Sequence, residues 1–154
     1  MARLQNKVAI VTGAAQGIGK GIARALGKEG AVVALWDIAD HVQGIAKELR
    51  DSGSKAYAYT VNVADIGKVD QTASEISDQF GKIDILVNNA GTAIFSPFVE
   101  MTPEDRDIVF NINFNGMWNC TKAIIPGMLN RFHWMPAQLL PLLGPAPYWF
   151  VPLK

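Results

Sequence analysis

The fold is decided by the stretch Val8-Ala9-Ile10-Val11-Thr12-Gly13-Ala14-Ala15-Gln16-Gly17-Ile18-Gly19. Its first four residues are apolar and mostly β-branched, which predicts a buried strand. A turn of small residues follows, and residues 20–26 then continue with apolar side chains at helical spacing. A strand, a glycine-rich turn and a helix in this order bring unpaired N–H groups and the positive end of a helix dipole together. A phosphate group binds well at such a point.

The same alternation continues along the chain. Apolar runs predict further strands at 31–36, about 55–61 and 83–87, and helical spacing predicts helices over 42–49, 66–80 and 102–129. Strands that alternate with amphipathic helices form right-handed βαβ units and a parallel sheet. We therefore expect an α/β fold with a doubly wound, Rossmann-like parallel sheet, and a ligand crevice between the first and fourth strands if the strand order is 3-2-1-4.

Composition narrows the functional classes. The 14 acidic and 14 basic residues balance, so nothing in the charge favours nucleic acid or an anionic membrane as a partner. Cys120 is the single cysteine, and its apolar helical setting favours a core residue over a reactive thiol. Residues 1–7 lack the apolar region of a signal peptide and no segment resembles a membrane helix, so we expect a cytoplasmic protein.

Two motifs together point to a family. The glycine turn has the form Thr-Gly-x-x-x-Gly-x-Gly rather than the usual G-x-G-x-x-G, and Asn88-Asn89-Ala90-Gly91 follows the strand predicted at 83–87. In this combination the chain resembles the short-chain dehydrogenase/reductase family over roughly residues 5–130. The resemblance implies an oxidoreductase that acts on alcohol or carbonyl groups with a nicotinamide dinucleotide.

The second predicted strand ends in Asp37, at the distance from the glycine turn that is expected of a ribose-binding carboxylate. A carboxylate there would repel a 2′-phosphate by about 4 kcal/mol for unit charges about 4 Å apart at an effective dielectric of about 20. No Arg or Lys stands at 15, 16 or 38 to offset this, so we expect NAD rather than NADP. The alternative is that Asp37 serves only as a helix N-cap.

The resemblance extends the expected cofactor groove. Asn62 stands where the family usually has Asp, and its amide oxygen could accept from the adenine amino group while the Val63 N–H donates to the ring. Asn88 or Asn89 could instead tie the strand ends together. The full expected set is Gly13, Gln16, Gly17, Ile18, Gly19, Asp37, Ile38, Asn62, Val63, Asn89, Ala90 and Gly91. We expect no metal site.

The catalytic set of the family is incomplete in this sequence. Asn113 matches the helical Asn of the proton relay, with a local polar residue as the alternative. The family also uses a Ser and a Tyr-x-x-x-Lys, but no serine follows Asn113, and Pro152 stands four residues after Tyr148. The other two tyrosines of the chain, Tyr57 and Tyr59, come before Asn113 in the sequence. Reduction of a carbonyl needs a tuned proton donor, so we expect the chain as given to be inactive.

The pattern changes after residue 130. Residues 131–154 hold five of the eight prolines, and neither helical nor strand periodicity continues. We therefore expect an incomplete Rossmann domain at 1–130 and an irregular Pro-rich tail at 131–154. Three explanations are open: a truncated or frame-altered family enzyme, a non-catalytic NAD-binding or dimerisation module, or an enzyme with an unfamiliar site in the tail.

The helix predicted at 102–129 is apolar nearly all round, which predicts burial on more than one side. In the family this helix commonly packs against a second subunit, so a homo-oligomer is implied. Pro126 should kink the helix or loosen its last turn. Without a following strand, the strand at 83–87 becomes a sheet edge, which residues 148–151 of the tail could cover.

Overall fold

A computed structural model of the chain describes residues 2–131. Its centre is a parallel sheet with the order β3-β2-β1-β4, which is the order under which the sequence predicted a crevice between the first and fourth strands. The strands are β1 (Val8–Thr12), β2 (Val32–Asp37), β3 (Lys55–Thr60) and β4 (Ile85–Val87). Every residue of β1 is buried, because this strand lies between two others and is covered on both faces.

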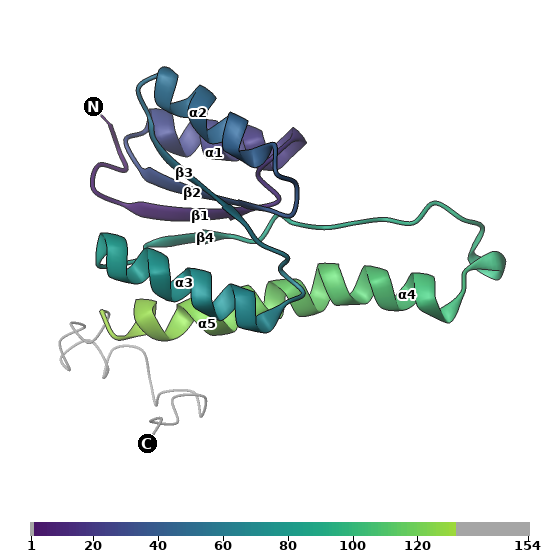
Figure 1. The fold of residues 1–154 in the computed structure, drawn as a ribbon. Helices are drawn as coiled ribbons and strands as arrows, with labels where there is room; N and C mark the ends of the chain where they lie inside the picture. Colours follow the sequence, from purple (N-terminus) through teal and green to yellow (C-terminus); the bar gives the residue numbers. More distant parts are fainter. Residues whose placement is uncertain (1, 132–154) are drawn as a thin grey trace, which may run out of the picture.

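Helices cover both faces of the sheet (Figure 1). On one face lie α1 (Gly17–Lys28) and α2 (Val42–Asp51), and on the other lie α3 (Ile66–Phe80) and α5 (Met117–Leu129). Each layer has its own core. Ile10, Trp36 and Ile76 belong to the core under α3 and α5, and Val11 and Leu35 belong to the core under α1 and α2. The α/β doubly wound fold predicted from the sequence is therefore confirmed.

The helix starts follow local chemistry that the sequence carries. The Asp65 carboxylate accepts from the Lys68 N–H and caps α3. Thr102 and Asp105 form a reciprocal capping box at the start of α4 (Pro103–Phe110), with Pro103 at the first helical position. These caps satisfy N–H groups that would otherwise lack partners.

The fourth predicted strand is shorter than expected, because Asp84 replaces part of the backbone ladder. Its N–H donates to the Val8 carbonyl at 2.8 Å, while its carboxylate accepts from the Val8 N–H at 2.9 Å. The regular strand therefore starts at Ile85. Within the described part of the chain, β4 pairs with β1 alone and forms one edge of the sheet.

The segment after β4 extends away from the sheet. It passes through the short helix η1 (Phe98–Glu100) and returns as α4, which continues through the π-helix η2 (Asn111–Gly116) into α5 (Figure 1). The expected burial of this helix on more than one side is wrong within the single chain: Phe110 is 62% exposed and Trp118 is 60% exposed. The reason is that α4, with Phe110, projects beyond the sheet, whereas α5 packs on α3 through one face, with Cys120 and Ile124 buried and Trp118 outside that contact. Pro126 lies inside α5, which runs on to Leu129.

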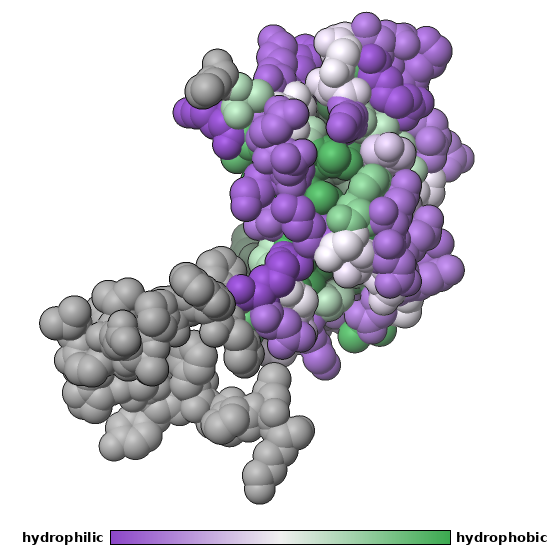
Figure 2. Space-filling model, turned by 90° about the vertical axis from the view of Figure 1, so that its left-hand side faces the viewer, coloured by the Kyte–Doolittle hydropathy of each residue, from purple (hydrophilic) through white to green (hydrophobic). Residues whose placement is uncertain are grey.

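Figure 2 shows the face of the molecule that carries the N-terminus. Hydrophilic residues cover most of this face, and apolar residues are visible mainly at its centre. Among residues 2–131, no helix has the length and apolar character needed to span a bilayer. The expectations of an irregular tail and of an edge cover at 148–151 lie outside the described residues.

Candidate functional site

A groove of about 430 Å³ opens where β1 and β4 end, at the point where the strand order reverses. It brings together every residue that the sequence suggested for cofactor contact, and it adds three that the sequence analysis missed: Val61, Thr92 and Ile112. The lining consists of Gly13, Gln16, Gly17, Ile18, Gly19, Asp37, Ile38, Val61, Asn62, Val63, Asn89, Ala90, Gly91, Thr92 and Ile112. Val61, Thr92 and Ile112 adjoin Asn62, Gly91 and Asn113 in the sequence. Their position beside these candidate residues was the only feature of the sequence that could have indicated them.

Each glycine of the turn has its own physical reason. Gly13 adopts a φ of +65°, and a Cβ there would lie 2.8 Å from the Ala90 Cα. A Cβ at Gly19 would lie 2.1 Å from the Gly13 oxygen, so this glycine lets α1 pack against the turn. Gly17 has a φ of +52° and open space around its missing side chain. Gly13 and Gly19 therefore allow close packing, whereas Gly17 supplies a left-handed backbone conformation beside open space.

The first turn of α1 supplies donors to the groove. The first amide bonded inside the helix is that of Lys20, which donates to the Gln16 carbonyl at 3.1 Å. No acceptor in residues 2–131 takes the N–H of Gly17, Ile18 or Gly19, and Gln16 makes no side-chain cap. These amides and the helix dipole favour an anion at this end of the groove.

Thr12 and Asn89 hold the ends of β1 and β4 together. The Thr12 hydroxyl accepts from the N–H groups of Asn89 and Ala90, both at 3.0 Å, and donates to the Val87 carbonyl at 3.3 Å. The Asn89 amide group donates to the carbonyls of Thr12 at 2.9 Å and of Gly13 at 3.1 Å. The strand-tying role is thus present in Asn89, which also lines the groove. Asn88 instead donates to the Thr121 hydroxyl at 3.1 Å.

Asp37 connects two loops at the groove wall. One carboxylate oxygen accepts from the Ala15 N–H at 2.9 Å, and the other accepts from the Ala39 N–H at 3.0 Å. A carboxylate offers about four acceptor positions, so both oxygens keep capacity for a ligand. The alternative role as a helix N-cap does not fit, because α2 starts at Val42 and its N-cap position is His41.

The first two basic side chains of α1 that follow the glycine turn, Lys20 and Arg24, are both paired with a carboxylate of α2. Glu48 of α2 accepts from Lys20 at 2.7 Å and from Arg24. The hydrogen bond from Lys20 and the one from Arg24 lower the pKa of Glu48. These contacts join α1 to α2. Among the described residues that line the groove, Asp37 is the one with an ionisable side chain.

Asn113 lies in the π-helix η2 and is bound at both ends of its amide. Its Oδ1 accepts from the Thr92 N–H at 2.8 Å, and its Nδ2 donates to the Thr92 carbonyl at 2.9 Å. The side chain therefore fixes the backbone just after Gly91. π-Helical turns are rare and are often found at functional sites. A purely local hydrogen bond along the helix, which was the alternative, is not what this side chain makes.

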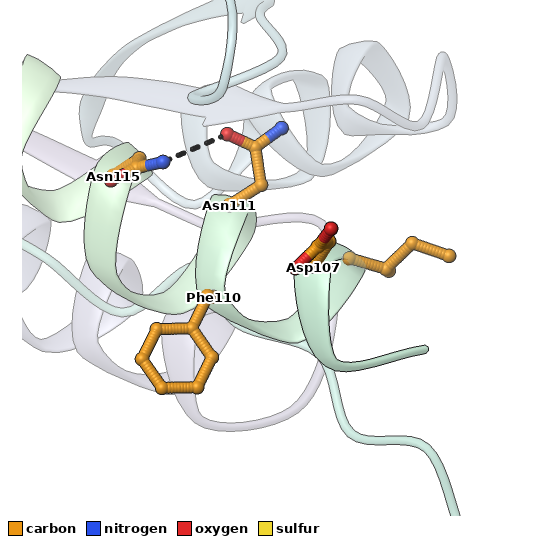
Figure 3. A pocket seen from close by; sticks show the side chains of 5 residues that line it. Asp107, Phe110, Asn111 and Asn115 are labelled. Atoms are coloured by element: carbon orange, nitrogen blue, oxygen red, sulfur yellow. Dashed lines mark hydrogen bonds between the residues drawn. The ribbon is translucent and has the colours of Figure 1, made fainter. Parts of the chain in front are cut away.

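A second hollow, of about 410 Å³, lies along α4 and η2 and is lined by Asp107, Ile108, Phe110, Asn111 and Asn115 (Figure 3). The Asn115 amide donates to the Asn111 oxygen at 3.2 Å, and Phe110 projects to the other side of the helix. All of its lining comes from one continuous helical segment, and no glycine turn or helix start opens onto it. Among the described residues, the glycine turn and the start of α1 open onto the first groove instead.

The parallel sheet, its covering helices and the glycine turn define a Rossmann-like α/β protein. The chain belongs to the short chain dehydrogenase family, whose family model matches residues 7–133. It is 43% identical to the oxidoreductase UcpA of Salmonella typhimurium over 131 residues, which are 85% of this chain and 50% of the relative. It is 36% identical to the 3-oxoacyl-[acyl-carrier-protein] reductase FabG of Thermotoga maritima, over 84% of this chain and 53% of that protein.

A solved structure shares the fold. A metagenomic short-chain oxidoreductase in complex with NADP superposes with a TM-score of 0.80 at 30% identity, over 84% of this chain and 59% of the other. The chain thus spans about half the length of the curated relatives that it matches.

Proposed function

We propose that this chain is an NAD(H)-binding portion of a short-chain oxidoreductase. The observation that carries the proposal is the first turn of α1, whose unpaired N–H groups open onto a groove between the ends of β1 and β4. In this reading the pyrophosphate lies on the N–H groups at Gly17–Gly19. The turn residues, Asp37, the 61–63 segment and Asn89–Gly91 surround the rest of the dinucleotide.

We further propose that NAD(H) is preferred over NADP(H). Asp37 supports this, because its carboxylate lines the groove and, among residues 2–131, no Arg or Lys lines the groove beside it. The solved relative in complex with NADP makes both cofactors necessary in the test. Fluorescence titration should give a lower Kd for NADH than for NADPH, and Asp37→Ala should narrow the ratio. A lower Kd for NADPH in the unaltered chain would refute the preference.

The chain as given is proposed to bind cofactor without turning over a substrate. Its 154 residues contain Asn113 of the family's catalytic set but no Ser after it and no Tyr-x-x-x-Lys. Bound nicotinamide would supply hydride, but the groove-lining side chains among residues 2–131 include no Tyr, His, Lys or Cys whose pKa could be tuned to protonate a carbonyl, and the Asp37 carboxylate already accepts two backbone N–H bonds. NADH oxidation with a panel of ketones and aldehydes should stay at the rate without protein. Turnover above that rate would overturn this proposal while leaving cofactor binding intact.

The second candidate is a non-catalytic dimerisation module, and the exposed apolar residues of α4–α5 favour it. Phe110, Phe114 and Trp118 are each more than half exposed. A surface of this kind is more typical of an interface than of a free helix. Sedimentation velocity should show association that Trp118→Glu weakens, whereas Ile66→Glu, a control on α3 at 49% exposure, should not. A monomer at all concentrations would exclude this candidate.

A further inference from the structure

The segment between β3 and α3, residues 61–65, forms the groove wall at Val61–Val63 and is held from behind by α5. Asn119 of α5 is 9% exposed, and its Nδ2 donates to the Val63 carbonyl at 3.1 Å. The two residues are far apart in sequence, so this contact is a tertiary one. Asn119 itself does not line the groove, and any effect on a ligand must pass through Val63.

Gly116 makes a second contact with the same residue. A Cβ at position 116 would lie 2.5 Å from the Val63 Cγ2 and 3.1 Å from its Cβ. The glycine therefore lets the Val63 side chain rest against the helix backbone. A hydrogen bond to the carbonyl and a close steric fit to the side chain together restrict how the Val63 backbone can turn.

The turn itself leaves one donor unused. Asn62 Oδ1 accepts from the Ala64 N–H at 3.0 Å, and the Asn62 carbonyl accepts from the Asp65 N–H at 3.0 Å. Within residues 2–131, no group accepts a hydrogen bond from the Val63 N–H. Val63 is 7% exposed and lines the groove, so its N–H is a donor that residues 2–131 leave unused at the groove wall.

We propose that Asn119 is a positioning residue for the base end of the groove. By holding the Val63 carbonyl against α5, with Gly116 fixing the side chain, it directs the free Val63 N–H toward the bound base. A fixed N–H donor favours an unprotonated ring nitrogen, as in adenine, and disfavours hypoxanthine, whose corresponding nitrogen carries a proton. The proposal rests on the proposed binding of NAD(H) in this groove.

The test compares NADH with its hypoxanthine analogue, because the two differ only at the base. Asn119→Asp keeps the size of the side chain but replaces the donor with an acceptor that faces the Val63 carbonyl. It should weaken NADH binding roughly 3- to 10-fold, the range expected for one lost hydrogen bond, and should weaken the analogue less. The ratio of the two Kd values, which a general loss of stability would not change, should move toward one.

Two further variants complete the experiment. Gly116→Ala should lower the same ratio by pushing on Val63 from the other contact, and Ile124→Val, a buried change further along α5, should leave it unchanged. An unchanged ratio in folded Asn119→Asp would overturn the inference, as would an unchanged ratio in Gly116→Ala if Asn119→Asp does not fold. If the unaltered chain shows no saturable NADH binding, the proposed function fails and this inference fails with it.

Discussion

Gly19 offers a sharp test of the packing beneath the glycine turn. Gly19→Ala would place a Cβ 2.1 Å from the Gly13 oxygen and 2.5 Å from the Asn89 amide nitrogen, whereas ordinary contact begins at about 3.4 Å. The turn or α1 must therefore move by more than an ångström. The nearest atom is backbone, which cannot rotate away as a flexible side chain can. Overpacking of this kind costs about 1–3 kcal/mol of unfolding free energy.

Gly21→Ala is the matched control two residues further along α1. Apart from its chain neighbours and the backbone of α1, no atom of residues 2–131 lies within 4 Å of a Cβ at Gly21, and its φ lies outside the positive range. Alanine there should raise the unfolding free energy by up to about 1 kcal/mol, because alanine loses less backbone entropy than glycine in a helix. The two variants change the same residue type in the same helix and should differ in sign.

The measurement is urea and thermal unfolding of both variants, followed by circular dichroism. A difference of about 1–4 kcal/mol between them corresponds to a gap in Tm of roughly 3–15 °C for a chain of this size. Gly19→Ala should be the less stable variant in both experiments. The packing argument is refuted if Gly19→Ala is as stable as Gly21→Ala.

Three further predictions concern residues outside the groove. Burial raises the pKa of Cys120 to about 11, so its thiol should resist a disulfide reagent at pH 8 until urea unfolds the chain; rapid labelling of folded protein would contradict this. Burial opposes the charge of Asp84, but the Val8 N–H, Lys82 and Lys7 outweigh it and lower its pKa below the usual 3.8. The ionised carboxylate therefore stabilises the fold at pH values above its unfolded-state pKa. Asp84→Asn should lose this stabilisation in full at pH 7, and the loss should shrink as the pH falls through the folded-state pKa of Asp84. A loss that is independent of pH in urea titrations would be inconsistent with this. Thr102→Ala removes the capping box of α4 and should cost about 1 kcal/mol in the same unfolding assay, with no cost as the contrary result.

The sequence was sufficient for the fold because its signals are local and agree with one another. The apolar run Val8–Val11, the glycine turn and the caps at Asp65 and Thr102 each predict one element, and the alternation of strands and helices then limits the topology. These units limit the strand order to a few doubly wound arrangements, and the structure has the order β3-β2-β1-β4. The late start of β4 at Ile85 was harder to predict, because it depends on a hydrogen bond from the Val8 N–H of the neighbouring chain segment to the Asp84 carboxylate.

The site could be predicted wherever a motif marks it. The glycine turn, Asp37 and Asn89–Gly91 lie around one groove, although their role as cofactor contacts stays a prediction. The roles of Thr12 and Asn119 were not recognised, because each acts through a tertiary hydrogen bond. Thr12 is the first residue of the glycine-turn motif, but the motif does not indicate its partners at 89 and 90, and Asn119 belongs to no motif. The exposure of Phe110 was missed for a related reason, since apolar spacing shows that a face seeks a partner but does not show whether this chain supplies one.

The proposed function depends most on where a dinucleotide binds to the chain. Two-dimensional amide NMR of ¹⁵N-labelled protein, titrated with NADH, tests this at each residue. Saturable shifts should appear at Gly13, Gly17, Gly19, Val63 and Gly91 around the groove, and amides beside the hollow on α4, such as that of Ile108, should stay unchanged. Shifts confined to α4, or no saturable shift at the glycine turn, would contradict the proposal that this groove holds the cofactor.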